Sequence, residues 1–112
     1  KGQVDIIQPD IVKTPGFTTM IKIANMAETL GVPITCHNTQ PTISTVAHAH
    51  FVAATTGVPF KQEYNIEPVS IRDETPVLAS PLNISEGYMD IPNGPGLGIE
   101  LDMDAVKKLT NV

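Results

Sequence analysis

The chain has 112 residues, a net charge of −5 and a hydrophobic content of 41%, which together suit one small folded domain rather than a disordered tail. It has no cluster of Lys and Arg, so we expect no nucleic-acid partner, and no apolar run nears the roughly 20 residues that span a bilayer, so we expect no membrane partner. The single cysteine, Cys36, excludes an internal disulfide framework, and we therefore expect a reducing, cytoplasmic setting.

The first predicted element is a short β-rich run at 3–10, which ends at the carboxylate of Asp10. The chain does not begin with Met and starts inside this run, so we expect it to be part of a longer protein that begins upstream. Turn-forming residues at 13–16 lead to a predicted helix at 17–30, with Thr14 or Thr18 as its candidate cap. Gly31 suits the left-handed conformation that ends many helices. One helical face carries the apolar residues Phe17, Met20, Ile21, Ala24 and Ala27.

The same alternation of strand and helix continues through the middle of the chain. A strand is predicted at 32–37, ending at His37, and a further strand at 60–64, ending near Glu63. Between them a helix is predicted at 42–56, with Ile43, Val46, Ala47, His50 and Ala54 on one face. This order indicates right-handed crossovers and a parallel sheet of the α/β class. The pattern alone fits both a doubly wound sheet and a segment of a (β/α)8 barrel.

The character of the sequence changes after residue 64. Residues 65–82 are rich in proline and have no clear period, and 86–92 predict a turn and a short strand. A glycine-dense bend follows at 93–98, and a closing helix is predicted at 102–109 with Asp102 as its cap. We therefore divide the chain into a βαβαβ segment at 1–64 and a closing segment of the same domain at 65–112.

Three consecutive predicted strands end in residues capable of acid–base chemistry, namely Asp10, His37 and Glu63. The carboxyl ends of parallel strands lie at one face, where barrel active sites are found, so these side chains can converge. A carboxylate beside a histidine fixes the ring's tautomer and raises its basicity, and such a base can take a proton from carbon. On pattern alone, ordinary polar residues at strand ends remain the alternative.

Several ordered motifs carry a resemblance to a known family. They are Gln8-Pro9-Asp10, Pro15-Gly16, Lys22-Ile23-Ala24, Ala27-Glu28, Gly31-Val32-Pro33, His37-Asn38 and the closing run Ile91 to Ile99. Over essentially its whole length the chain resembles the C-terminal part of the mandelate racemase/muconate lactonizing enzyme family of the enolase superfamily. The resemblance implies a partial (β/α)8 TIM barrel, made of strands six to eight and the C-terminal segment.

The resemblance also implies roles for the three strand-end residues. His37 matches the family's general base and Asp10 its orienting partner, while Glu63 is similar to the glutamate that hydrogen-bonds the substrate carboxylate. An aspartate at the sixth strand marks the mandelate racemase-like branch, whereas the lactonizing branch has a lysine there. The family's Mg²⁺ is bound by carboxylates that would lie upstream, so no metal ligand is expected within this chain.

The implied activity of the intact protein is removal of the proton α to a carboxylate, giving an enediolate. We expect the substrate to be a sugar acid and the reaction a dehydration, because the polar residues Asn38, Thr39 and Gln40 follow His37; Asn38 and Gln40 are the candidate substrate-binding residues. A racemase or epimerase of a 2-hydroxy acid is one alternative, and an inactive barrel fragment with a structural role is another. We expect this chain alone to be inactive and the intact enzyme to be a homo-oligomer.

Two other features suggest sites but have simpler explanations. Cys36 precedes His37 on a strand, so their side chains point to opposite faces, and we expect a buried thiol rather than a nucleophile. His48 and His50 are two residues apart on a predicted helix and point in different directions, which argues against a shared metal site. We expect His48 to be solvated and His50 to be packed or hydrogen-bonded.

Overall fold

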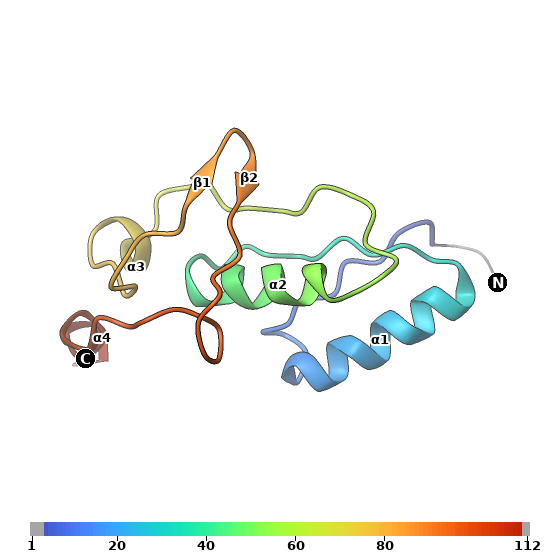
Figure 1. Cartoon of the computed structure of the whole chain (residues 1–112), viewed down its shortest axis with the longest axis horizontal. Helices are drawn as coiled ribbons and strands as arrows, with labels where there is room; N and C mark the ends of the chain where they lie inside the picture. Colours follow the sequence, from blue (N-terminus) through green and yellow to red (C-terminus); the bar gives the residue numbers. More distant parts are fainter. Residues whose placement is uncertain (1–3, 111–112) are drawn as a thin grey trace.

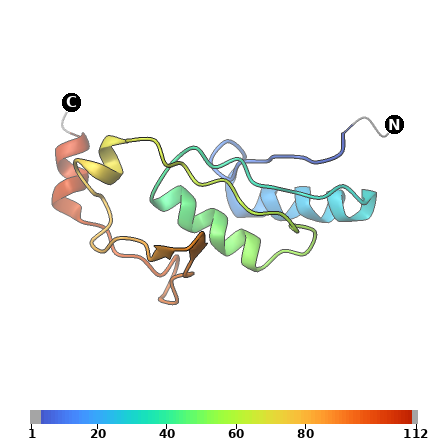
Figure 2. The ribbon, with the colours of Figure 1, turned by 90° about the horizontal axis from the view of Figure 1, so that it is seen from above.

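The computed structural model describes residues 4–110, so Gln3, where the first predicted strand begins, lies outside the described residues. The elements in order are α1 (Gly16–Leu30), α2 (Ile43–Ala53), α3 (Ser70–Asp73), β1 (Ile84–Ser85), β2 (Tyr88–Met89) and α4 (Met103–Thr110) (Figure 1). The chain extends 49 × 32 × 28 Å with a radius of gyration of 15.3 Å, where a compact domain of this length would have about 13 Å. Helix α1 lies at one end of this elongated body, α2 in the middle, and α3 and α4 together at the other end (Figures 1 and 2).

The predicted strands at 3–10 and 32–37 do not form as regular strands, but the extended segments 7–9 and 33–37 do pair in parallel, the direction that the sequence predicted. Ile7 and Ile34 form a parallel bridge, and the Ile7 N–H donates to the carbonyl of Pro33 at 3.1 Å. The Thr35 N–H returns a bond to Ile7 O, and the His37 N–H donates to Pro9 O, each at 3.1 Å. The last of these bonds fixes the register in which His37 lies beside Asp10.

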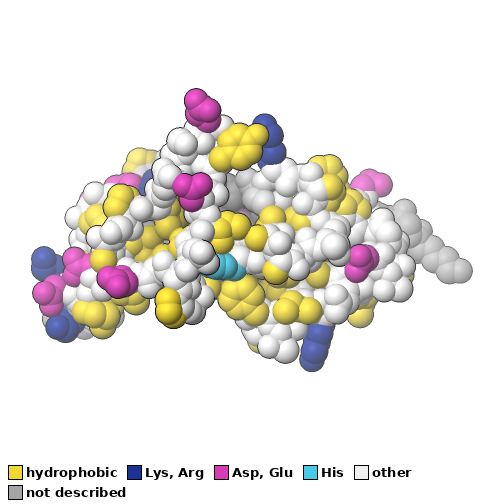
Figure 3. Space-filling view, viewed as in Figure 1, with side chains coloured by type: hydrophobic (Ala, Val, Ile, Leu, Met, Phe, Trp, Pro, Cys, Tyr) yellow, Lys and Arg dark blue, Asp and Glu magenta, His cyan; other side chains and the backbone are white. Residues whose placement is uncertain are grey.

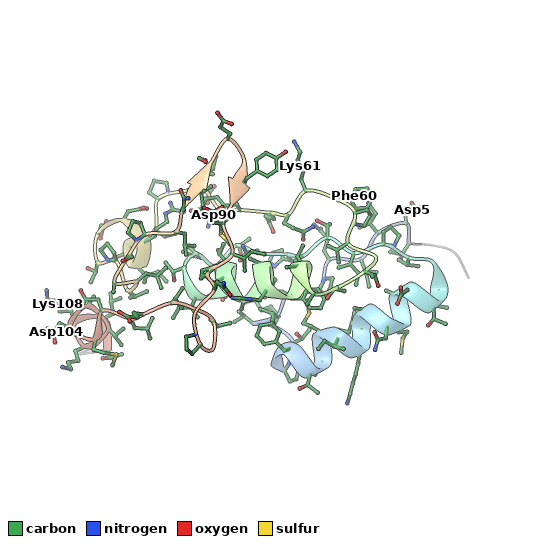
Figure 4. All side chains as sticks on the ribbon, in the orientation of Figure 1. Asp5, Phe60, Lys61, Asp90, Asp104 and Lys108 are labelled. Atoms are coloured by element: carbon green, nitrogen blue, oxygen red, sulfur yellow. The ribbon has the colours of Figure 1, made fainter. Side chains whose placement is uncertain are left out.

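The predicted strand at 60–64 is wrong, because this segment forms no regular strand. The backbone N–H groups of Cys36 and Asn38 bond instead to the side-chain oxygens of Gln62 and Glu63, at 2.8 and 2.7 Å. The segment therefore contacts 35–38 through hydrogen bonds that involve side chains, and no backbone–backbone bond joins these two described segments. Lys61 points outward, away from α2 (Figure 4).

Helix α1 begins at Gly16, one residue earlier than predicted, and neither candidate threonine caps it. The Thr14 hydroxyl donates to Asp10 O at 2.9 Å, so it holds the preceding turn rather than the helix. The helix ends as expected at Gly31, which has a φ of 67° and donates its N–H to carbonyls of the last turn. Because its Cβ is absent, glycine adopts this left-handed conformation without strain.

The core lies between α1, α2 and the parallel pair. Helix α2 runs over 43–53, shorter than predicted, and it buries side chains on more than one face: Ser44, Thr45, Val46, Ala47, His48 and Phe51. Of the face predicted for α2, Ile43 is 40% exposed, whereas Val46 and Ala47 are buried. Buried residues from all three parts form one cluster: Ile11, Met20, Ala24, Ala27, Ile34, Cys36, Ala47 and Phe51.

The closing segment is held by local contacts and by an antiparallel bridge between Leu78 and Leu101. The expected cap of α4 is confirmed, because Asp102 Oδ1 accepts the N–H groups of Asp104 and Ala105 at 2.9 and 3.0 Å. β1 and β2 form a short antiparallel hairpin where a turn and strand were predicted, and α3 was not predicted. Across the described range 4–110, none of the helices has both the length and the apolar character needed to cross a membrane.

Large apolar side chains are exposed in several places on the surface, including over α1 (Figure 3). Met26 and Leu30 on α1 are 67% and 70% exposed, and Ile66 is 83% exposed. Isolated exposed apolar residues are normal on a globular protein, but several large ones on an elongated body mark surface that another part of a protein can cover.

We expect Gly98→Ala to destabilise the fold more than the matched change Gly96→Ala. Both glycines have left-handed φ values, 69° and 65°, so either change costs about 1–2 kcal/mol in backbone strain. A Cβ at Gly98 would also lie 2.7 Å from the backbone nitrogen of Gly94 and 2.8 Å from the carbonyl carbon of Pro92, whereas a Cβ at Gly96 meets nothing within 4 Å. Overpacking should add about 1–3 kcal/mol at Gly98 alone. Urea unfolding measures the difference, and equal losses would contradict the close approach.

Candidate functional site

The structure brings Asp10 and His37 into direct contact. Because the His37 N–H bonds to Pro9 O, the two side chains leave neighbouring extended segments at the same level. His37 Nδ1 lies 3.0 Å from Asp10 Oδ2, and the side chains are 40% and 4% exposed. The pair therefore consists of a buried carboxylate and an imidazole that solvent can reach.

The second oxygen of Asp10 is bound within the following turn. Oδ1 accepts the Val12 N–H at 2.8 Å, and the backbone carbonyl of Asp10 accepts the N–H groups of Lys13 and Thr14. Burial works against the charged form of this carboxyl group, but the hydrogen bonds from His37 and from Val12 outweigh it and hold the pKa of Asp10 below its usual value. Asp10 is therefore a fixed anion at neutral pH.

The contact with Asp10 determines which nitrogen of His37 can do chemistry. An ionised carboxylate only accepts hydrogen bonds, so His37 Nδ1 carries a proton and donates it to Asp10 Oδ2. In the neutral ring, Nε2 on the opposite edge then holds the lone pair. A histidine with this tautomer and an exposed edge has the arrangement of a general base.

Glu63 lies one segment further along, beside the residue that follows His37. Its Oε2 accepts the N–H of Asn38 at 2.7 Å, while its own carbonyl accepts from the Asn38 side-chain amide at 3.2 Å. Among residues 4–110 no hydrogen bond joins Glu63 directly to Asp10 or His37. The three strand-end residues thus come from adjacent segments, and only Asp10 and His37 touch.

The two candidate substrate-binding residues differ in their surroundings. Asn38 is only 3% exposed, and its amide bonds to the hydroxyl groups of Thr45 and Ser44 as well as to Glu63 O. Gln40 is half-buried and lines a groove of about 890 Å³ that continues towards α3 and α4. Asn38 is therefore engaged within the chain, whereas Gln40 borders open space.

His48 was expected to be solvated, and this prediction is wrong. Its side chain is 3% exposed, its Nε2 accepts the Ile11 N–H at 3.0 Å, and Nε2 also lies 3.6 Å from Asp10 Oδ1. Helix α2 is covered on this side by the turn after Asp10, which the apolar spacing of the helix did not show. The one trace in the sequence is Ser44, four residues before His48, because such a pair stacks on one helical face. His50 was expected to be packed or hydrogen-bonded, and this is confirmed, because it is half-buried and its Nε2 lies 3.0 Å from Leu97 O.

Cys36 is fully buried, as the sequence predicted. Burial, and after it the negative charge of Asp10, raises the pKa of its thiol to about 11. A thiol must lose its proton to act as a nucleophile, so Cys36 is inert at neutral pH.

Residues 4–110 contain no group of three or more His, Cys, Asp or Glu side chains that could hold an ion. Asp10, the most buried carboxylate of the site, is already committed to His37 and Val12. The described residues therefore do not fit a Mg²⁺ site.

A family model, related sequences and a solved structure all indicate the same family for this chain. The family model described as Enolase C-terminal domain-like matches residues 1–105. The chain is 40% identical over 111 residues to D-galactarolactone cycloisomerase of Agrobacterium fabrum and 36% identical over 104 residues to D-xylonate dehydratase of Haloferax volcanii. These alignments cover 94% and 93% of the chain but 29% and 24% of the two enzymes. The crystal structure of 3,6-anhydro-D-galactonate cycloisomerase from Zobellia galactanivorans superimposes with a TM-score of 0.80 and 33% identity, covering 94% of this chain and 29% of that one. The chain thus spans less than a third of the length of these relatives.

We expect the thiol of Cys36 to stay protonated in the folded chain until the pH nears 11. The raised pKa means that its contribution to stability is fully present below pH 9.0, its ordinary value, and is lost as the pH rises through about 11. Cys36 is the only cysteine, so its ¹³Cβ chemical shift follows this thiol alone, whereas ultraviolet absorbance would also follow the two tyrosines. The chain unfolded in guanidinium is the control and should titrate near 9.0. A folded chain that titrates like the control would contradict the burial.

Proposed function

The chain belongs to the mandelate racemase/muconate lactonizing enzyme family of the enolase superfamily, and on that premise we propose that the intact protein removes the proton α to a carboxylate, with His37 as the base. The observation that carries this proposal is the contact of His37 Nδ1 with the buried Asp10 carboxylate at 3.0 Å. The relatives are dehydratases and cycloisomerases, so the family supports an enzyme.

In the proposed reaction His37 Nε2 takes the α-proton of the substrate. Asp10 holds the ring in the tautomer that leaves Nε2 free, and its charge then stabilises the imidazolium that forms. Glu63 is proposed to hydrogen-bond the substrate carboxylate as it gains enolate character, which requires a protonated carboxyl oxygen at that moment. Its bond to the Asn38 N–H uses Oε2 and leaves Oε1 for this role.

The Mg²⁺ implied by the family is proposed to be bound by parts of the intact protein outside this chain. The described residues do not fit such a site. We likewise propose that the parallel pair and its helices are the sixth and seventh βα units of a barrel, with segment 60–64 at the position of the eighth strand. Without the rest of the barrel and its metal site, the chain alone is proposed to be inactive.

The proposed substrate class is a sugar acid and the proposed reaction its dehydration. After the α-proton is removed, the enediolate expels the β-hydroxyl group as water when an acid donates a proton to it, and the His37 imidazolium can be that acid. Thr39 is exposed and Gln40 borders a groove, so both can meet substrate hydroxyl groups, and Asn38 holds the loop that carries them. The relationship to D-xylonate dehydratase supports this choice.

A second candidate is cycloisomerisation of a lactone or anhydro form of a sugar acid. The 40% identity to D-galactarolactone cycloisomerase and the structural match to 3,6-anhydro-D-galactonate cycloisomerase favour it. The first step is the same proton loss. The two reactions differ in the leaving group, because a β-oxygen that belongs to a ring stays attached to the product and no water is lost.

We expect His37→Asn to abolish turnover of the intact enzyme while leaving its melting temperature close to that of the wild type. Asparagine removes the base but keeps a polar side chain of similar size beside Asp10. Asp10→Asn should lower kcat by about 10⁴-fold, as in other His–Asp pairs, because a neutral amide no longer fixes the tautomer. Steady-state kinetics measure both changes.

The matched control is His50→Gln, since His50 lies on α2 and bonds to Leu97 O rather than to Asp10. Its kcat should be close to that of the wild type. A His37→Asn enzyme with near-normal kcat would show that another group is the base.

We expect a panel of sugar acids to yield a 2-keto-3-deoxy product with loss of water. The assay should run alongside lactone and anhydro forms of the same acids, with product mass separating dehydration from ring opening, since only dehydration removes a water. Polarimetry on the same samples detects racemisation. Turnover of ring forms alone would establish the cycloisomerase, and optical change without a keto product would establish a racemase or epimerase.

A further inference from the structure

Besides the inert thiol of Cys36, His48 is a buried titratable group near the dyad that the proposed reaction does not use. It lies on α2, 38 residues after Asp10, yet its Nε2 is 3.6 Å from Asp10 Oδ1. Asp10 therefore sits between two histidines, with His37 at Oδ2 and His48 near Oδ1. A protonated second imidazole could donate a hydrogen bond to the Asp10 carboxylate and so weaken its bond with His37.

The hydrogen bonds of His48 show why it does not compete. Its Nδ1 donates to Ser44 O at 2.9 Å, and its Nε2 accepts the N–H of Ile11 at 3.0 Å. A nitrogen that accepts from an N–H has no proton to donate to Asp10, so the ring is neutral. Burial also lowers the pKa of His48, while Ser44 O, Asp10 and Glu63 partly oppose this effect and His37 adds to it.

The bond to Ile11 connects α2 to the turn that presents Asp10. Ile11 directly follows Asp10, and the next N–H, that of Val12, binds Asp10 Oδ1 at 2.8 Å. If Ile11 lost its acceptor, its buried N–H would seek another partner and the turn would shift, and with it the carboxylate. Shifts of about 1 Å in a catalytic group can cost about 100-fold in rate.

We propose that His48 is a positioning residue, a neutral imidazole that fixes the Asp10 turn through the Ile11 N–H so that the Asp10 carboxylate serves His37 alone. The inference rests on the proposed role of His37 as the base. His48 acts through Asp10 and has no contact with substrate in this scheme.

The test uses the intact enzyme with three variants. In His48→Leu the acceptor is lost, and we expect kcat to fall about 10- to 100-fold with little change in KM, because substrate binding does not involve His48. In His48→Gln the side-chain carbonyl can accept the Ile11 N–H, so most of kcat should return. His50→Leu is the matched control on the same helix and should leave kcat close to the wild-type value.

A second measurement does not depend on activity or on a variant that folds. Long-range ¹H–¹⁵N correlation spectra of the intact enzyme report which imidazole nitrogen carries the proton. We expect His48 to be neutral with its proton on Nδ1. A charged ring, or a neutral ring with its proton on Nε2, would overturn the proposal.

The kinetic outcomes separate this proposal from the proposed function. If His37→Asn is inactive but His48→Leu has normal kcat, the positioning role is wrong and the base assignment stands. If His48→Leu loses kcat and His48→Gln does not recover it, an acceptor for Ile11 is not what matters, and the proposal is overturned. If His37→Asn stays active, the proposed base itself is wrong.

Discussion

The buried carboxylate of Asp10 is the constraint on which the rest of the site depends. A charged carboxylate removed from water is stable only when its oxygens find donors, and here His37 supplies one and the Val12 N–H another. These bonds, rather than solvent, keep the group ionised. The same bonds fix the turn at 11–15, from which α1 starts. Because the bond to Asp10 uses Nδ1 of His37, it also leaves the Nε2 edge of the ring free. The ionised state of Asp10 and the conformation of the turn that follows it therefore depend on the same hydrogen bonds.

Backbone register is what lets such a contact form between residues 27 positions apart. The parallel pairing places the His37 N–H on Pro9 O, and a shift by one residue would turn His37 to the opposite face. That opposite face is occupied by Cys36, which packs into the core beneath α1 and α2. The burial of Cys36 and the exposure of His37 are thus two results of one register, and the core helps to enforce the geometry of the site.

The sequence was sufficient for the parts of the structure that depend on local chemistry. Gly31 ends α1 and Asp102 caps α4 as predicted. The alternation of side chains along 32–37 correctly predicted that Cys36 is buried and that His37 lies on the opposite face. Prediction from the sequence failed where tertiary contacts determine the local structure. Segment 60–64 has the composition of a strand, but the side chains of Gln62 and Glu63 take the hydrogen bonds that its backbone would have made. The environment of His48 depends on a turn that lies 37 residues earlier, and the apolar spacing of α2 carries no information about that turn.

The backbone at Thr42 explains how α2 comes to present His48 to that turn. Thr42 has a φ of 69° and a ψ of −111°, a conformation that is rare for a β-branched residue and costs about 1–3 kcal/mol. Such strain persists only where the surroundings fix it, and Pro41, Thr42, Ser44 and Thr45 are all buried. The sharp change of direction lets α2 start directly after the loop that follows His37. Two turns of helix at most then separate this loop from His48, so one short stretch of chain carries both histidines that flank Asp10.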